Sequence, residues 1–142
     1  MSTEVKRPQV SLVISVWNRK DDLRENLAAI REQTVPADQV IVVDNDSSDG
    51  TPEMVIEEFP EVQLIRMPSS DYGACETFNV GFASAKGDFV GILDDDVILP
   101  STFVEHMVQK FAEEPDSTAI LSPKVIEPEM PDWYLNSETL HI

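Results

Sequence analysis

Short apolar runs alternate along this chain with stretches that have helical spacing, and this alternation constrains the fold more than any other feature. Two runs rich in apolar and β-branched residues, 10–16 and 40–43, are expected to be strands buried on both faces, and residues 63–67 and 89–93 are expected to be a third and a fourth strand. A fifth, shorter strand is expected over residues 119–125. Strands that alternate with helices form βαβ units, in which the strands are parallel. The sequence therefore predicts a Rossmann-like α/β fold with three α/β/α layers and a mostly parallel sheet.

Four amphipathic stretches separate and follow these runs, over residues 21–33, 51–59, 74–85 and 101–111. Thr51 is the expected N-cap of the second helix, and Pro52 follows it in the first turn. The third helix is expected to face the sheet with one stripe of residues: Ala74, Phe78, Phe82 and Ala85. Cys75 lies beside this stripe and is expected to be a small core filler rather than a nucleophile.

Composition narrows the classes of function and location. The 142 residues match one ordinary domain, and 27 acidic residues against 10 Lys and Arg give a formal net charge of −17. This charge argues against nucleic-acid binding, which depends on neutralising phosphates with basic residues. The chain has no apolar run long enough for a membrane span, no secretory leader and one cysteine, so a cytoplasmic location is expected, with a peripheral position at the inner face of the membrane as an alternative.

Polar residues follow the expected strands at their carboxyl ends. These ends are Trp17-Asn18-Arg19, Asp44-Asn45-Asp46, Ser69-Ser70-Asp71 and Asp94-Asp95-Asp96. In an open parallel sheet the ligand binds beyond the carboxyl ends of the strands. Four polar ends on one edge, three of them with acidic residues, therefore predict a binding site.

The three adjacent aspartates allow three interpretations. They could form a solvated loop before the next helix, or Asp94 and Asp96 could be hard oxygen ligands for Mg²⁺ or Mn²⁺ that recruit a diphosphate. An acid/base pair is the third interpretation, and it is disfavoured because nothing apolar beside these residues is expected to raise a carboxylate pKa.

The segment DNDSSDGT, residues 44–51, is either a plain turn or a reader of a nucleobase. Asn and Asp form turns readily, but Asp44 or Asn45 could also accept a hydrogen bond from a base N–H. Neither G-x-G-x-x-G after the first strand nor a P-loop motif is present, so dinucleotide-dependent oxidoreductases and P-loop NTPases are disfavoured.

Four segments of residues 9 to 128 resemble, in order and spacing, the donor-binding half of the family 2 glycosyltransferases, which have the GT-A fold. The segments are VSLVISVWNR, VIVVDNDSSDGT, NVGFASAKGDFVGILDDDVILP and ILSPKV. The resemblance implies an inverting, metal-dependent glycosyltransferase that uses a nucleotide-diphosphate sugar, with Mn²⁺ or Mg²⁺ as cofactor. It also implies that Asp94 and Asp96 bind the metal, with Asp95 between them near the ribose or the metal. The implied base pocket consists of Ser15 and Val16, mainly through their backbone, with Asn18, Asp44 and Asn45.

Three positions depart from the family pattern. Trp17 replaces the usual Tyr, which matters little if the ring only packs, and Asn45 replaces a second Asp that many members carry. Phe78 stands where many members have Arg, so a cation expected on the phosphate side is absent there. The expected donor is a UDP- or dTDP-sugar.

The resemblance divides the chain into a nucleotide-sugar-binding half, residues 1–128, and a tail or start of a truncated acceptor region, residues 129–142. Such a chain lacks the acceptor half, and no residue can be assigned as the general base. A glycan or lipid-linked acceptor would then need a second copy, a partner or a further segment to complete its site. Three alternatives stay open: a non-catalytic nucleotide-sugar-binding module, a haloacid-dehalogenase-type phosphatase, and a receiver-like domain phosphorylated on Asp44.

Overall fold

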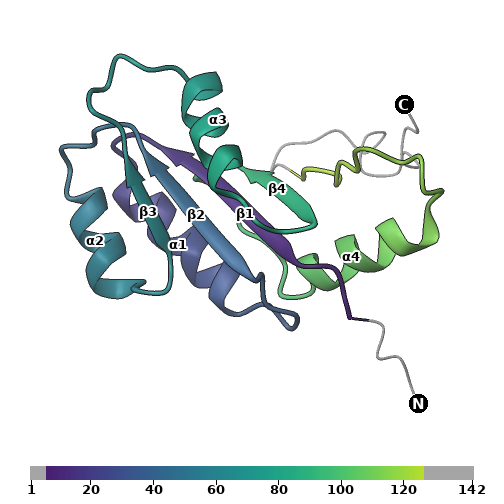
Figure 1. Ribbon diagram of the computed structural model, residues 1–142. Coiled ribbons are helices and arrows are strands. Elements are labelled where there is room, and N and C mark those ends of the chain that lie inside the picture. The colour runs from purple at the N-terminus through teal and green to yellow at the C-terminus, as the bar shows by residue number, and fades with distance from the viewer. Residues whose placement is uncertain (1–5, 127–142) are drawn as a thin grey trace.

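A single parallel sheet organises the molecule (Figure 1), and the computed structural model describes residues 6–126. Its strands are β1 (Val10–Val16), β2 (Gln39–Asp44), β3 (Gln63–Arg66) and β4 (Phe89–Leu93). They lie in the order β3-β2-β1-β4, and every neighbouring pair is parallel. The four main predicted strands are therefore confirmed, each to within one residue at its ends.

Helices cover both faces of this sheet, which confirms the predicted three-layer α/β/α architecture. They are α1 (Lys20–Arg31), α2 (Thr51–Glu58), α3 (Ala74–Ser84) and α4 (Phe103–Glu113). Alternate residues of β1 point to opposite faces of the sheet. Leu12 and Ile14 pack with residues of α1, α2 and α4, whereas Val13 packs in the cluster on the face covered by α3. Within residues 6–126, no helix is both long and apolar enough to cross a membrane.

The inward face of α3 differs from the predicted stripe. Its buried residues are Thr77 and Gly81, while Phe82 is exposed, and the neighbouring Cys75 is exposed rather than a core filler. A Cβ at residue 81 would overlap the Cγ1 of Val13. Phe78 and Ala85 of the predicted stripe are partly buried and pack against the cluster that contains Val13, so the prediction is correct in part. The pattern missed Thr77 and Gly81, which are the fully buried residues of this helix.

The fifth strand predicted over residues 119–125 is absent from the structure. Ile120 is 83% exposed, and Pro123 has no N–H to donate to a strand ladder. Residues 119–123 instead line an apolar groove of about 350 Å³ beside β4 and α4. An apolar run becomes a strand only where it pairs with a neighbour, and this run does not pair with β4.

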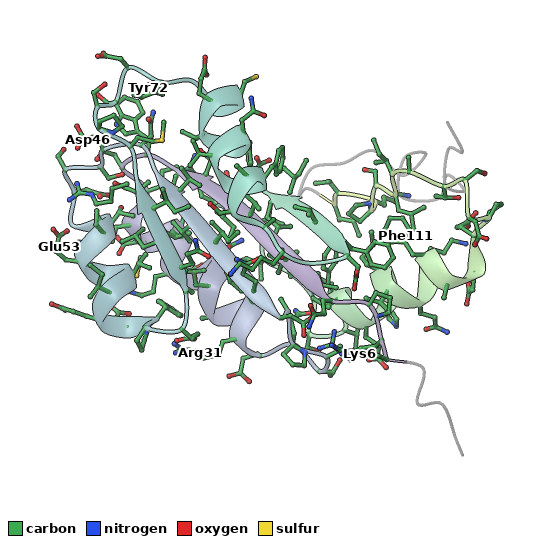
Figure 2. All side chains as sticks on the ribbon, viewed as in Figure 1. Lys6, Arg31, Asp46, Glu53, Tyr72 and Phe111 are labelled. Carbon is green, nitrogen blue, oxygen red and sulfur yellow. The ribbon has the colours of Figure 1, made fainter. Side chains whose placement is uncertain are left out.

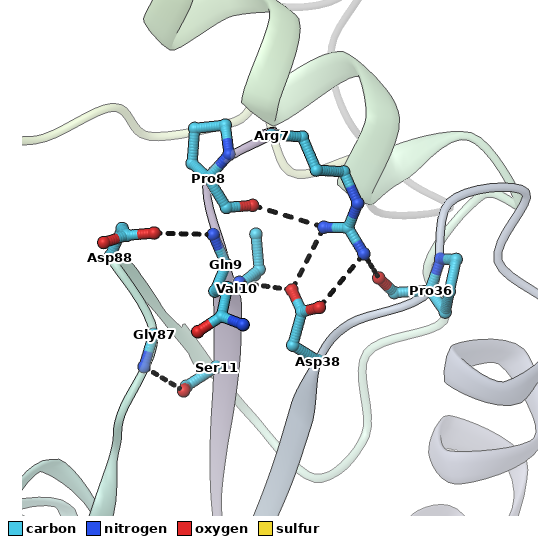
Figure 3. Close-up of polar contacts among 9 residues, drawn as sticks. All are labelled: Arg7, Pro8, Gln9, Val10, Ser11, Pro36, Asp38, Gly87 and Asp88. Atoms are coloured by element: carbon cyan, nitrogen blue, oxygen red, sulfur yellow. Dashed lines mark hydrogen bonds and ion pairs between the residues drawn. The ribbon is translucent and has the colours of Figure 1, made fainter. Parts of the chain in front are cut away.

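Polar contacts fix the amino-terminal edge of the sheet (Figure 3). Asp38 accepts hydrogen bonds from the backbone N–H of Val10 at 2.8 Å and from the guanidinium of Arg7 at 3.0 and 3.1 Å. Asp88 accepts from the backbone N–H of Gln9 at 2.8 Å. These contacts hold the start of β1 against the starts of β2 and β4. The opposite, carboxyl edge carries Asp46 and lies near Tyr72, far from Lys6 (Figure 2).

Candidate functional site

The carboxyl ends of β1 and β2 are tied together by hydrogen bonds between their loops. The backbone N–H of Asn18 donates to the Ser47 hydroxyl at 2.9 Å, and the side-chain oxygen of Asn18 accepts from the Ser48 N–H at 2.8 Å. Asn18 and Asp46 both have left-handed backbones, with φ of 51° and 57°, a conformation that Asn and Asp tolerate better than most residues. The structure thus brings the predicted residues of these two strand ends together.

Asp44 and Asn45 are both buried, and each has one oxygen without a hydrogen-bond partner within residues 6–126. The Oδ2 of Asp44 accepts from the Ser47 N–H at 3.1 Å and faces the Nε of Arg66 at 3.5 Å, which leaves its Oδ1 unpartnered. Asn45 donates its amide N–H to the carbonyl of Tyr72 at 2.8 Å, which leaves its oxygen unpartnered. An unsatisfied buried acceptor costs about 1–3 kcal/mol, so these two atoms are suited to accept from a ligand.

Ser15 and Val16 lie beside the end of β2 and hold the neighbouring elements. The hydroxyl of Ser15 hydrogen-bonds the hydroxyl of Thr77 on α3 at 2.7 Å. The carbonyl of Val16 accepts from the Asn45 N–H at 2.9 Å, and its side chain is buried. Both residues therefore position the strand ends within this structure.

Trp17 does not merely pack, because its side chain is 57% exposed directly after β1. An exposed indole at a ligand-binding edge offers a flat apolar surface on which a ring can stack. The expectation that this substitution matters little is therefore not supported by its environment. The signal was visible in the sequence as an aromatic residue at a strand end.

The aspartate loop after β4 is anchored from α1 by a buried side chain. Asn26 donates its amide N–H groups to the carbonyls of Val97 at 2.6 Å and Asp94 at 3.3 Å. These contacts use only the backbone of the loop. Asp94 and Asp96 keep exposed carboxylates, while the side chain of Asp95 is 14% exposed.

The pKa of Asp95 is raised to about 6, chiefly by burial; Arg19 opposes this shift, and the nearby carboxylates of Asp96, Asp22 and Asp94 add to it. The expectation that nothing near the aspartates would raise a carboxylate pKa is therefore wrong. The cause is tertiary, because the loop folds Asp95 inward between two exposed neighbours.

Arg19 faces the aspartate loop and received no role from the sequence. Its Nε lies 2.8 Å from Asp22 and 3.7 Å from Asp95, and its Nη2 lies 3.5 Å from Asp96. The sequence placed the residues after β1 and after β4 on one edge of the sheet, but it did not indicate that Arg19 would contact the aspartates. Their proximity follows from the pairing of β1 with β4.

The aspartate loop has the chemistry for a divalent cation. Asp94 and Asp96 provide exposed hard oxygen donors, and the guanidinium of Arg19 already lies against Asp96. Within residues 6–126, no three His, Cys, Asp or Glu side chains are grouped so that they could hold a metal ion together. A Mg²⁺ site usually has one or two protein carboxylates and is completed by phosphate oxygens and water.

Comparisons with known proteins agree with this fold. The chain is 28% identical over 116 residues to "Putative glycosyltransferase EpsH" of Bacillus subtilis, covering 79% of this chain and 33% of that protein. The structure of S. aureus TarS 1-349 in complex with UDP superposes with a TM-score of 0.69 at 18% identity, over 84% of this chain and 40% of that one.

A third similarity is to the mannosyltransferase PcManGT of Pyrobaculum calidifontis, whose structure was solved with GDP-Man and Mn²⁺. The TM-score is 0.58 at 32% identity, over 68% of this chain and 30% of that one. These similarities show that the parallel sheet and its helices have the GT-A fold. The model of the family "Glycosyl transferase family 2" matches residues 11–141, so the chain belongs to glycosyl transferase family 2.

Proposed function

We propose that this chain binds the donor of an inverting, metal-dependent glycosyl transfer, and that the donor is a nucleotide-diphosphate sugar. The observation that carries the proposal is the pair of unpartnered, buried oxygens on Asp44 and Asn45. They lie on the same sheet edge as the aspartate loop, so one ligand with a base at one end and a diphosphate at the other could meet both. The chain spans only a third of the EpsH length, so the activity of a whole protein is part of this proposal.

The base end of the ligand is proposed to be uridine or thymidine. Asp44 and Asn45 both offer acceptors, which suit the N3–H of a uracil or thymine ring and a ribose hydroxyl. The Arg66 side chain lies over Asp44, so it must turn aside as a base enters. Ser15, Val16 and Asn18 are proposed to line the base pocket, and the exposed indole of Trp17 would offer a stacking surface beside it. The similar structures of TarS contain UDP or UDP-GlcNAc and that of PcManGT contains GDP-Man, so the proposed base preference rests on the acceptors of Asp44 and Asn45.

The diphosphate end is proposed to meet a Mn²⁺ or Mg²⁺ ion held by Asp94 and Asp96, with Asp95 near the ribose or the metal. Such an ion would neutralise the charge that grows on the diphosphate as it leaves the sugar. The Mn²⁺ in the structure of PcManGT supports a divalent cation as cofactor.

Transfer of the sugar also requires an acceptor and a general base. We propose that the acceptor site and the base are provided by polypeptide outside this chain's 142 residues. A glycan or lipid-linked acceptor would be held by a second copy, a partner chain or additional polypeptide. We further propose a cytoplasmic site of action, including the inner face of the membrane, since a single exposed thiol suits a reducing compartment.

Calorimetric titration of the 142-residue chain tests this proposal. UDP and dTDP are expected to bind at least about tenfold more tightly than GDP, and their binding should weaken strongly when EDTA removes divalent metal. Asp96→Asn should weaken UDP binding in Mn²⁺ by about tenfold or more, since a charge-assisted metal contact is lost, while uridine binding stays unchanged.

The matched control is Asp116→Asn, because Asp116 is an exposed aspartate outside the site. It should bind UDP as the unaltered chain does. Equal losses of UDP and uridine binding in Asp96→Asn would contradict a role through metal and phosphate. Tighter binding of GDP would overturn the base assignment, and stabilisation by acetyl phosphate would favour the phosphatase or receiver alternatives.

A further inference from the structure

We propose that Arg19 is a built-in counter-cation of the aspartate loop, which yields to the divalent cation and then binds the diphosphate of the donor. This inference rests on the proposed function, because it names a residue that would act on the same ligand. It assigns Arg19 a positioning and binding role that the sequence pattern did not.

The contacts of Arg19 show a cation already seated among the carboxylates. Its Nε hydrogen-bonds Asp22 at 2.8 Å, a contact within the first turn of α1. The same guanidinium lies 3.7 Å from Asp95 and 3.5 Å from Asp96, distances of ion pairs rather than hydrogen bonds. Asp22 is therefore the hydrogen-bonded partner of Arg19, and the two loop aspartates are held only by charge.

This difference in strength makes the loop contacts replaceable. Three adjacent carboxylates repel one another, and the guanidinium offsets that repulsion. A divalent cation carries twice its charge and ligates carboxylate oxygens directly, so it would compete with Arg19 for Asp96. Asp22, which lies outside the loop, would keep Arg19 near the site after Asp96 is given up.

Arg19 has both the room and the hydrogen-bond donors to bind an anion. Its side chain is 48% exposed and borders an open polar hollow of about 460 Å³, lined also by Asn18, Lys20, Asp21, Asp22 and Asp49. Of the arginines on α1, Arg24 pairs with Asp21 and Glu58, and Arg31 pairs with Glu61, whereas Lys20 lines the same hollow as Arg19. A guanidinium offers a planar pair of donors that matches phosphate oxygens, so Arg19 suits the diphosphate that arrives with the metal.

The experiment compares Arg19→Gln with the unaltered chain in two separate titrations. Binding of Mn²⁺ alone is followed by the electron paramagnetic resonance signal of free Mn²⁺, and binding of UDP at saturating Mn²⁺ is followed by calorimetry. Arg19→Gln is expected to bind Mn²⁺ about two- to fivefold more tightly, because an exposed competing ion pair is removed. It is expected to bind UDP about tenfold more weakly, and uridine equally well.

Two further variants separate this role from general electrostatics. Arg19→Lys keeps the charge but loses the planar fork, so Mn²⁺ affinity should stay near that of the unaltered chain while UDP affinity falls in part. Arg24→Gln removes a partly exposed arginine from the same helix and should change neither titration.

Opposite changes in metal and UDP affinity for Arg19→Gln, with none for Arg24→Gln, support the proposal. Changes in the same direction, no change, or equal effects of Arg24→Gln overturn it. If the unaltered chain binds no UDP in the presence of Mn²⁺, the proposed function fails and this inference fails with it. If the unaltered chain binds UDP and only the variants fail to differ, the role of Arg19 alone is overturned.

Discussion

Gly81 determines how closely α3 approaches the sheet. A Cβ at this position would overlap the Cγ1 of Val13 and lie 3.3 Å from the Cγ2 of Val43, and both valines are fully buried. The close-packed interior leaves these valines no free volume to move into. Gly81→Ala is therefore expected to lower the free energy of unfolding by about 1–3 kcal/mol, despite the better helix propensity of Ala. Urea denaturation measures this change.

Asn79→Ala provides the control, because Asn79 is exposed on the same helix. It should leave stability unchanged or raise it by a few tenths of a kcal/mol, since Ala is the better helix former. A Gly81→Ala variant as stable as the unaltered chain would show that α3 can move outward freely. Such a shift would also disturb Tyr72, which precedes α3 and accepts the hydrogen bond from Asn45.

At the scale of elements, Asp49 connects the starts of two helices. Its Oδ2 accepts from the backbone N–H of Lys20 at 3.0 Å, and its Oδ1 accepts from the backbone N–H and the hydroxyl of Thr51. Neither α1 nor α2 has a side-chain hydrogen bond from its own N-cap residue, Arg19 or Gly50. The predicted N-cap Thr51 is instead the first residue of α2. One carboxylate thus satisfies N–H groups of both helices and places them side by side at the site.

This arrangement predicts a pH-dependent contribution to stability. Burial alone would raise the pKa of Asp49, but the hydrogen bonds from Thr51 and Lys20 outweigh it and lower the pKa below its ordinary value of 3.8. A lowered pKa in the folded state means that the contribution is complete above about pH 4 and is lost as the pH falls through the folded value. Asp49→Asn is expected to lower the free energy of unfolding by about 1–2 kcal/mol at neutral pH, the range of a lost helix cap.

Urea unfolding at several pH values checks this prediction. The difference between Asp49→Asn and the unaltered chain should shrink as the pH is lowered below about 4, because the native carboxyl then also becomes neutral. Asp116→Asn, at an exposed position, should match the unaltered chain throughout. A difference that stays constant with pH would show that Asp49 contributes through packing rather than through its charge.

The strands were predictable because each element carries its own signal. A β-branched run buried on both faces, as in β1, needs no knowledge of its neighbours, and the polar residues after it must then lie at the carboxyl edge. The burial of Gly81 on the inward face of α3 was not predictable, because this residue contacts the sheet closely only since it has no side chain. The prediction of a strand over residues 119–125 was wrong for a related reason, since pairing with another strand is not encoded in the apolar run alone.

In the candidate site, too, some features could be predicted from the sequence and others could not. Asp44 and Asn45 could be placed from the end of β2, and the structure adds their burial and their unpartnered oxygens. Arg19 could not be given a role, because its contact with Asp96 joins two loops 77 positions apart through the packing of β1 against β4. The raised pKa of Asp95 also depends on burial that exists only in the folded chain.

The whole molecule carries a charge that opposes its own folding. The 27 acidic residues exceed the 10 Lys and Arg, and arginines such as Arg7, Arg31 and Arg66 already pair with carboxylates. The excess negative charge therefore remains largely on the surface, where like charges repel and destabilise the compact state. A salt-rich cytoplasm or a merely acidic surface would each account for this composition, and in both cases salt should stabilise the fold.

Thermal unfolding at different KCl concentrations tests this expectation. Raising KCl from about 0.05 M to about 1 M shortens the Debye length to about 3 Å, which screens repulsion between surface carboxylates. The Tm at neutral pH is expected to rise by about 3 °C or more, corresponding to about 1 kcal/mol. The exposed ion pairs are weak and lose little in return. At about pH 4.5, where a large share of the Asp and Glu side chains is protonated, the same salt step should raise the Tm much less. An equal rise at both pH values would contradict the charge argument, because salt would then act by strengthening apolar burial.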